Sequence, residues 1–299
     1  MEKRPLGKTG MNVTVLGYGG AEIGFENASQ ETVTQLLNAA LDAGLNVIDT
    51  AECYPNSEKM IGEAVGARRS EYFLFTKCGH ASGIDLPDWD PKLLEQHIER
   101  SLRRLKTDRV DLVQLHSCDE AALRKGEVIE VLQRARDAGK TRFIGYSGDS
   151  TAAAYAVECG AFDTLQTSCN IADQESIELT LPNAKARGMG VIIKRPVANA
   201  AWRTGKKPTE PYHHVYWDRL QELKYDFLTG DVGQAVMLAL RFTLAQEGVS
   251  TAIVGTKNPE RWAANAKALA EAGPLDAAEI AAIRARWKAV AHAEWIGQI

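Results

Sequence analysis

Four side chains that could transfer or orient a proton follow three consecutive apolar runs of the sequence. Asp49, Lys77 and His116 each end one of these runs, and Tyr54 lies in the polar stretch just beyond Asp49. A phenol, which ionises near pH ~10, donates a proton poorly at neutral pH unless its anion is stabilised. A neighbouring ammonium lowers the pKa of a phenol, and a carboxylate holds that ammonium in place. Asp49, Lys77 and Tyr54 therefore form a candidate proton relay, and His116 is a candidate for orienting a substrate carbonyl.

Each of these residues also has a purely structural interpretation. An Asp before a Thr commonly caps a turn, a Lys at a strand end commonly pairs with that Asp, and a single His is often a hydrogen-bonded core residue. Their joint placement at the ends of three successive runs favours the catalytic interpretation.

The chain has eight apolar runs of strand length, separated by segments with the period of a helix. The runs are 12–20, 45–50, 72–77, 110–116, 142–148, 164–170, 190–196 and 250–256. They are continuously apolar, as is typical of parallel strands covered on both faces. Two apolar stripes predict amphipathic helices over the sheet: Val33, Leu36, Leu37, Ala40 and Leu41, and Leu94, Ile98, Leu102 and Leu105.

Eight strand–helix units predict a closed (β/α)₈ barrel, whose active site lies at the carboxyl ends of the strands. An N-terminal lead-in with a hairpin turn at 6–10, a long segment at 197–230 and a tail from Leu275 account for the remaining residues. The 299-residue chain has no linker composition, so we expect one domain over residues 1–299. A doubly wound sheet is disfavoured because Glu22 stands where its glycine fingerprint needs a third glycine.

The composition excludes several classes of protein. With a net charge of −4 and a pI near 5.9, the chain has no basic face for nucleic acid or an anionic membrane. No apolar stretch approaches the length of a spanning helix, and we expect a cytoplasmic protein. The five cysteines form no C-x-x-C pair, which argues against a disulfide framework or a zinc ribbon.

Four segments together resemble the aldo-keto reductase superfamily: NVIDTAECYPNSE (46–58), FTKCG (75–79), VDLVQLH (110–116) and VGTKNPERWAAN (254–265). The resemblance implies a barrel that transfers a hydride reversibly between NADP(H) and an aldehyde or ketone. It makes Tyr54 the general acid, with its pKa lowered by Lys77 and Asp49, and His116 the residue that orients the carbonyl. The cofactor-binding residues that it implies are Gly20, Asp49, Ser147, Gln166, Arg195, Thr256, Lys257, Arg261 and Asn265.

The segment after the last run also suits an anion on chemical grounds. A hydroxyl, a cation, a capping amide and a proline at 256–259 predict a helix that begins at the barrel mouth, where free N–H groups bind anions. Arg261 and Asn265 share one face of that helix. The resemblance places the 2′-phosphate and the adenine there, which favours NADP over NAD. This chain departs from the family pattern at Ala264, where Glu is frequent, and at Gly255, where Lys is frequent.

The resemblance makes Ser147 and Gln166 partners of the nicotinamide carboxamide, with Gly148 standing where Asn is frequent. Asn170 is a further candidate, and a turn-capping role fits it equally. At the end of the seventh run the family commonly has an aromatic residue under the nicotinamide, whereas this chain has Lys194-Arg195-Pro196. Since a guanidinium plane stacks on rings, our hypothesis is that Arg195 takes that place.

The sequence does not select a substrate, an oligomeric state or a reaction direction. Glu22 and Trp89 could line the cleft or face water, the stretch 78–91 is irregular, and His80 has no visible partner. Large rings beyond the seventh run are either pocket walls or ordinary packing: Trp202, Tyr212, Tyr216, Trp217 and Trp295.

Two other classes stay open. The first is a non-catalytic NADP-binding subunit, a role that some relatives have beside membrane channels. The second is a metal-dependent hydrolase, for which His116, His80 and Cys118 are too scattered to make a convincing ligand set. We therefore predict a small-molecule carbonyl substrate and no metal.

Overall fold

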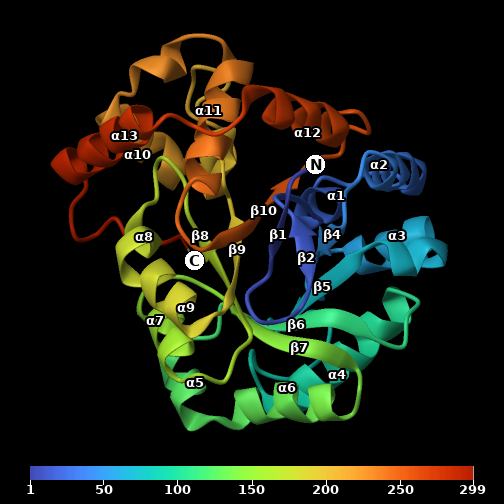
Figure 1. Cartoon of the computed structure of the whole chain (residues 1–299). Coiled ribbons are helices and arrows are strands. Elements are labelled where there is room, and N and C mark those ends of the chain that lie inside the picture. Colours follow the sequence, from blue (N-terminus) through green and yellow to red (C-terminus); the bar gives the residue numbers. More distant parts are fainter. Residues whose placement is uncertain (299) are drawn as a thin grey trace.

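Eight parallel strands close into a barrel, and an antiparallel hairpin precedes it (Figure 1). The structure is a computed structural model that describes residues 1–298. The hairpin pairs β1 (Lys3–Pro5) with β2 (Asn12–Thr14). The barrel strands are β3 (Leu16–Gly19), β4 (Val47–Asp49), β5 (Phe73–Cys78), β6 (Val110–His116), β7 (Thr141–Ser147), β8 (Thr164–Ser168), β9 (Gly190–Lys194) and β10 (Val249–Gly255). Around the barrel they follow one another in the order β10-β3-β4-β5-β6-β7-β8-β9. The predicted (β/α)₈ barrel is confirmed.

Helices surround the barrel, as Figure 1 shows. They are α1 (Ala21–Phe25), α2 (Gln30–Asp42), α3 (Ser57–Val65), α4 (Pro91–Arg104), α5 (Glu120–Lys125), α6 (Glu127–Asp137), α7 (Ser150–Glu158), α8 (Glu175–Leu179), α9 (Leu181–Arg187), α10 (His214–Leu223), α11 (Val232–Leu244), α12 (Arg261–Ala272) and α13 (Ala277–Val290). Within residues 1–298, no helix combines the length and apolar character needed to cross a membrane.

Both predicted amphipathic helices are present. In α2 the predicted stripe from Val33 to Leu41 is buried, and the Ser29 side chain caps the helix by accepting a hydrogen bond from Thr32 N. In α4, Asp90 caps the first turn and Pro91 occupies its first position, where a missing N–H costs nothing. These helices bury their apolar faces against the outside of the barrel and so pack the strands into one hydrophobic core.

The run at 12–20, expected as one strand, is divided into two. Asn12–Thr14 pairs with the hairpin, whereas Leu16–Gly19 pairs with β10 and β4. The change of partner occurs at Val15, which donates to Glu2 O at 3.1 Å and accepts from Ala252 N at 2.9 Å. Continuous apolarity cannot reveal this break because both halves are buried.

The hairpin closes the N-terminal end of the barrel. Leu6, Met11 and Val13 pack against Phe75 and Leu112 inside it, and all five are fully buried. The predicted turn is confirmed: Leu6 N donates to Met11 O at 2.8 Å, closing the loop that carries Gly7 and Lys8.

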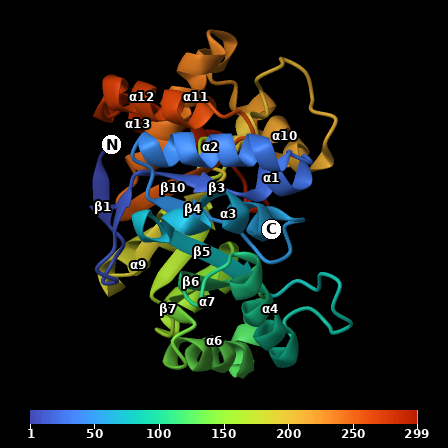
Figure 2. The same cartoon turned by 90° about the vertical axis from the view of Figure 1, so that its right-hand side faces the viewer.

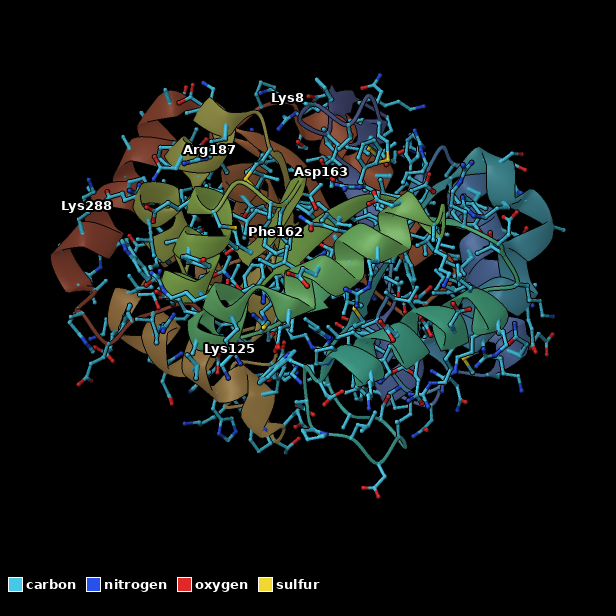
Figure 3. All side chains as sticks on the ribbon, turned by 90° about the horizontal axis from the view of Figure 1, so that it is seen from below. Lys8, Lys125, Phe162, Asp163, Arg187 and Lys288 are labelled. Carbon is cyan, nitrogen blue, oxygen red and sulfur yellow. The ribbon has the colours of Figure 1, made fainter. Side chains whose placement is uncertain are left out.

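Gly7 is required at this turn. It has a φ of +54°, and a Cβ there would collide with the backbone at Gly190, where β9 begins. Seen from below in Figure 3, Lys8 of the hairpin lies near Arg187 and Asp163, which precede β9 and β8, whereas Lys125 lies toward the other end.

The opposite end of the barrel is covered by long segments. In Figure 2 the loops after β5 and β9 and the C-terminus lie at the end away from β1. The segment after β9 contains two 3₁₀ helices, Ala198–Ala200 and Pro211–His213, and then α10. Trp202, Tyr216 and Trp295 are buried in a core shared with α11 and α13, as ordinary packing predicts, while Tyr212 is 46% exposed.

Candidate active site

A buried ion pair lies at the centre of the barrel mouth. Lys77 Nζ pairs with Asp49 Oδ1 and also donates to Thr50 O at 2.9 Å, and the two charged side chains are only 2% and 1% exposed. The other carboxylate oxygen, Asp49 Oδ2, accepts from Gln166 Nε2 at 2.9 Å and from Gln114 Nε2 at 3.3 Å. A buried pair withstands desolvation better when further hydrogen bonds support it, and Thr50, Gln114 and Gln166 supply such bonds here.

Tyr54 and His116 complete the predicted cluster. Lys77 Nζ lies 5.4 Å from the centroid of the Tyr54 ring. The His116 ring is 5.8 Å from the Tyr54 ring, at an interplanar angle of 77°. Among residues 1–298, no group forms a hydrogen bond with the Tyr54 hydroxyl. The structure therefore brings all four predicted residues together, and their catalytic roles stay predictions.

The expected lowering of the Tyr54 pKa is wrong for this structure. Burial raises the pKa of Tyr54 well above its ordinary value, and the negative charge of Asp49 raises it further. The physical reason is that burial removes the hydration that a phenolate needs, while the carboxylate of Asp49 repels its negative charge. At neutral pH Tyr54 thus keeps its proton.

Cys53 sets the hydrogen bonding of His116. Its Sγ lies 3.5 Å from His116 Nδ1. Burial, followed by the charge of Lys77, lowers the pKa of His116 well below its ordinary value, so the imidazole is neutral. Burial also raises the pKa of the Cys53 thiol to about 11, so that the S–H is retained. When this S–H donates to Nδ1, the ring carries its hydrogen on Nε2 and can donate to a carbonyl oxygen.

The loop that carries Tyr54 is anchored on both sides. Glu52 N donates to Lys77 O at 3.0 Å. The buried Glu52 carboxylate accepts from Arg104 Nη1 of α4 at 2.7 Å. Ser57 Oγ donates to Gly20 O at 2.7 Å. These bonds tie the loop to β5, α4 and the end of β3, and thus limit its movement.

Two predicted cofactor residues belong to the same network as the ion pair. Ser147 Oγ donates to Gln166 Oε1 at 3.1 Å, and Gln166 in turn donates to Asp49. Asn170 acts as a turn cap: its Oδ1 accepts from Ala172 N at 2.8 Å, and its Nδ2 donates to Arg195 O at 2.9 Å. The neighbouring ends of β6, β7 and β8 thus converge on Asp49.

Comparison with known proteins identifies the family. A sequence profile of the aldo/keto reductase family matches residues 15–288. This chain belongs to that family. It is 30% identical over 289 residues to L-galactose dehydrogenase of Arabidopsis thaliana, covering 91% of this chain and 89% of that protein. It is 28% identical over 299 residues to D-threo-aldose 1-dehydrogenase of a Pseudomonas species, covering 86% and 90%. The solved holo form of an aldo-keto reductase from Bacillus halodurans aligns with a TM-score of 0.84 at 27% identity and covers 99% of both chains.

In this aldo-keto reductase, hydrogen bonds from two guanidinium nitrogens fix the position of the Arg195 side chain. Its Nε donates to Tyr212 Oη at 2.6 Å, and its Nη1 donates to Ser168 Oγ at 2.8 Å and to Gln298 O at 2.6 Å. Asp149, which the sequence analysis missed, lies 3.6 Å from Nη1. Its guanidinium carbon also lies 5.3 Å from the centroid of the Tyr212 ring, and the hypothesis that Arg195 stacks on the nicotinamide stays a prediction.

Asp149 and Lys194 form a second buried ion pair at the mouth, with Nζ 2.8 Å from Oδ2. Burial lowers the pKa of Lys194 to about 8, although Asp149 opposes this shift. Asp149 Oδ1 also accepts from Thr167 Oγ1 and Ser168 N, at 2.8 Å and 2.7 Å. Asp149 therefore positions the ends of β8 and β9 beside the catalytic cluster.

The predicted anion-binding helix begins two residues later than expected. Its first residue is Arg261, because a separate turn at 258–260 precedes it. Asn258 Oδ1 caps that turn by accepting from Glu260 N at 3.0 Å, and Thr256 Oγ1 accepts from Asn258 N at 3.1 Å. Lys257 Nζ lies 3.0 Å from Glu26 Oε2. Arg261 and Asn265 both lie in α12, one turn apart as predicted.

The loop after β9 fits a dinucleotide. Arg195, Ala198, Asn199 and Ala200 all have positive φ, and Ala198 N and Ala200 N donate within the loop to Arg195 O and Val197 O. Asn199 Nδ2 and Trp202 Nε1 are buried N–H donors with no partner among residues 1–298. Buried donors without a partner are costly, and the phosphates of a nicotinamide cofactor are a matching acceptor. Sequence analysis missed Asn199 because positive φ at a non-glycine residue has no pattern in the sequence.

Glu22 explains one departure from the family pattern. Its carboxylate fills the space beside Gly255, so a larger side chain at that position would have to displace the end of the Glu22 side chain. Burial raises the pKa of Glu22 to about 7. Because a Glu in the unfolded chain ionises near ~4.3, the folded state binds more protons between these values, and folding becomes less favourable as the pH rises through this window.

We therefore expect Glu22→Gln to raise the melting temperature at pH 8 and to leave it nearly unchanged at pH 4, since Gln mimics only the protonated acid. Thermal unfolding at both pH values tests this. Glu63→Gln in α3 is the control, because Glu63 is exposed. Equal stabilisation by Glu22→Gln at the two pH values would contradict the explanation.

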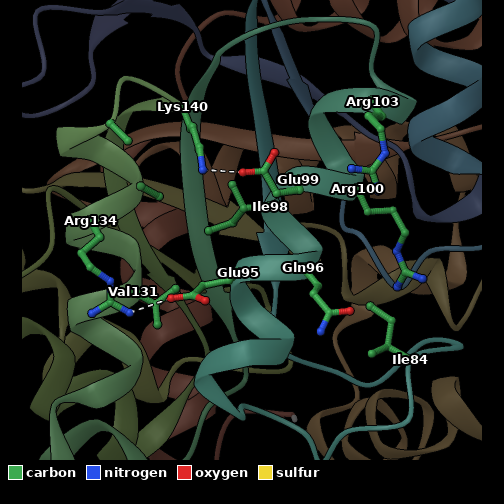
Figure 4. A pocket seen from close by; sticks show the side chains of 12 residues that line it. Ile84, Glu95, Gln96, Ile98, Glu99, Arg100, Arg103, Val131, Arg134 and Lys140 are labelled. Atoms are coloured by element: carbon green, nitrogen blue, oxygen red, sulfur yellow. Dashed lines mark hydrogen bonds and ion pairs between the residues drawn. The ribbon is translucent and has the colours of Figure 1, made fainter.

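A groove of about 760 Å³ lies elsewhere, between α4 and α6 on the outside of the barrel (Figure 4). Arg134 Nη2 bridges it to Glu95 at 2.9 Å, and Lys140 pairs with Glu99. None of the predicted site residues lines it. Within residues 1–298, no three His, Cys, Asp or Glu side chains are grouped as metal ligands.

Proposed function

We propose that this aldo-keto reductase reduces an aldehyde or ketone to an alcohol with NADPH, in a reversible reaction. The observation that supports this best is the meeting of Asp49, Lys77, Tyr54 and His116 at one mouth of the barrel. When bound, the nicotinamide supplies the hydride. The remaining chemistry falls to the four side chains.

Tyr54 acts as the proton donor in this proposal. Its raised pKa keeps the hydroxyl protonated at neutral pH. As negative charge develops on the carbonyl oxygen, the phenol transfers its proton, and Lys77 beside the ring stabilises the phenolate that forms. His116, neutral and donating from Nε2, holds the same oxygen and sets its direction. Asp49 keeps Lys77 in position.

The NADP preference depends on Arg261. A guanidinium binds a phosphate with two charge-assisted hydrogen bonds, and each bond to a charged group is worth about 1.5–3 kcal/mol. We therefore expect Arg261→Ala to raise the KM for NADPH tenfold or more, as ~1.4 kcal/mol implies. The KM for NADH, which lacks the 2′-phosphate, serves as the internal control. An equal rise for both cofactors would remove the argument for NADP.

The experiment that tests the function is fluorescence titration of the purified protein with NADPH and NADH, followed by a carbonyl screen. Two of the relatives are named for galactose and aldoses, so sugars belong in the screen beside aromatic and small aliphatic aldehydes. Tight NADPH binding without oxidation of NADPH by any carbonyl would favour a non-catalytic cofactor-binding subunit instead. A stoichiometric metal would overturn the proposal.

A further inference from the structure

A second imidazole lies against the catalytic cluster. The loop between β5 and α4, residues 79–90, places the His80 ring 4.8 Å from the His116 ring, at an interplanar angle of 67°. His116 is in turn 5.8 Å from Tyr54. Three rings that carry hydrogen-bonding groups therefore follow one another across the mouth of the barrel, and the reaction proposed above uses only two of them.

The loop holds His80 in a defined orientation. Asp88 Oδ2 lies 2.9 Å from His80 Nδ1, and Asp88 Oδ1 accepts from Ala81 N at 2.7 Å. The loop itself is fastened to β6, because Trp89 Nε1 donates to the backbone oxygen of His116 at 2.9 Å. Trp89 N donates to Gly79 O at 2.8 Å, which closes the loop at its base.

The partner of His80 determines what its free nitrogen can bind. Burial opposes ionisation of Asp88, but the hydrogen bonds from Ala81 N and His80 outweigh it and lower the Asp88 pKa, so Asp88 is a carboxylate. A carboxylate accepts the hydrogen on Nδ1, which leaves Nε2 of a neutral imidazole as an acceptor. Among residues 1–298, no group hydrogen-bonds this nitrogen. A carbonyl oxygen cannot satisfy it, whereas a hydroxyl group can.

We propose that His80, oriented by Asp88, is a specificity residue that accepts a hydrogen bond from a hydroxyl on the carbon next to the reacting carbonyl. We choose the neighbouring carbon because the His80 ring lies only 4.8 Å from the ring of His116, which holds the carbonyl oxygen in this proposal. The substrate class is then α-hydroxy aldehydes and ketones, to which sugars belong. The inference rests on the proposed function, since it needs the carbonyl to react at Tyr54.

A pair of substrates that differ by one hydroxyl measures this contact directly. Glycolaldehyde and acetaldehyde form one pair, and hydroxyacetone and acetone form another. A site that hydrogen-bonds a substrate hydroxyl discriminates against the analogue without it. Because His80 is partly open to solvent, we expect the wild-type kcat/KM to favour the hydroxylated member about tenfold, as one net hydrogen bond of ~1.4 kcal/mol implies.

The variants are His80→Ala, His80→Gln and Asp88→Asn. We expect His80→Ala and Asp88→Asn to bring the ratio of the two kcat/KM values close to 1. His80→Gln, whose carbonyl oxygen still accepts a hydrogen bond, restores part of the ratio. Asp85→Asn is the matched control, because Asp85 is an exposed residue of the same loop, and it keeps the wild-type ratio. NADPH titration of every variant shows that the barrel is intact.

The outcomes separate the two proposals. A wild-type enzyme that oxidises NADPH with no carbonyl of the screen would overturn the proposed function, and this inference with it. A wild-type enzyme that reduces both members equally, or a His80→Ala variant that keeps the wild-type ratio, would overturn the inference alone.

Discussion

Tyr54→Phe is expected to lower the turnover of carbonyl reduction by about 10²–10⁴-fold, the usual contribution of a positioned acid. The substitution removes only the transferable proton. The cofactor-binding candidates Arg195, Arg261 and Asn199 are untouched, so NADPH affinity stays close to the wild-type value. Single-turnover rates with excess NADPH, beside fluorescence titration of the same preparation, measure the two effects separately.

A matched control for this substitution is available at the same mouth. Tyr212→Phe also removes a phenolic hydroxyl, in this case one that accepts a hydrogen bond from Arg195. Its turnover should stay within a few-fold of wild type. Because the Tyr54 hydroxyl has no partner in the structure, Tyr54→Phe should also unfold at the wild-type temperature. Turnover retained in Tyr54→Phe would exclude Tyr54 as the proton donor.

Lys77→Met is expected to be both inactive and destabilised. Met has nearly the shape of the Lys stem, so the main change is the loss of the charge that compensates Asp49. Removing one partner of a buried ion pair leaves an uncompensated charge and typically costs about 3–5 kcal/mol of the free energy of unfolding. Denaturant titration at neutral pH measures this loss.

The double variant Asp49→Asn/Lys77→Met separates stability from catalysis. Without either charge the site is a neutral pocket, and most of the lost stability should return, since replacing both partners of a buried pair is often neutral. Turnover should not return, because no ammonium remains to stabilise the Tyr54 phenolate. A Lys77→Met protein as stable as the wild type would show that the pair is not held as the structure places it.

The sequence contained enough to predict the barrel and the meeting of Asp49, Lys77, Tyr54 and His116. Continuous apolar runs indicate parallel strands, and the carboxyl ends of parallel barrel strands share one rim. Asp49, Lys77 and His116 therefore had to converge if the barrel closed. Gln114, which completes the hydrogen bonding of Asp49, was within reach of the same reasoning, because it lies two residues before His116 on the same face of β6.

Other properties of the site depend on three-dimensional surroundings that no spacing encodes. The sign of the Tyr54 pKa shift comes from burial and then from the charge of Asp49, and residue types alone do not give the extent of that burial. The pairing of His80 with Asp88 occurs inside an irregular loop without periodicity. Positive φ at Asn199 has no pattern to detect either.

The hairpin at the far end of the barrel affects the route by which Tyr54 would regain its proton after each catalytic cycle. Leu6, Met11 and Val13 fill that end with buried apolar side chains, which offer no hydrogen-bonding groups to water. In the proposed reaction, the Tyr54 phenolate would therefore take its next proton from bulk water on the open side, past the imidazoles and the departing alcohol. Proton resupply and product escape then share one exit, and a solvent isotope effect on steady-state turnover should depend on the size of the product.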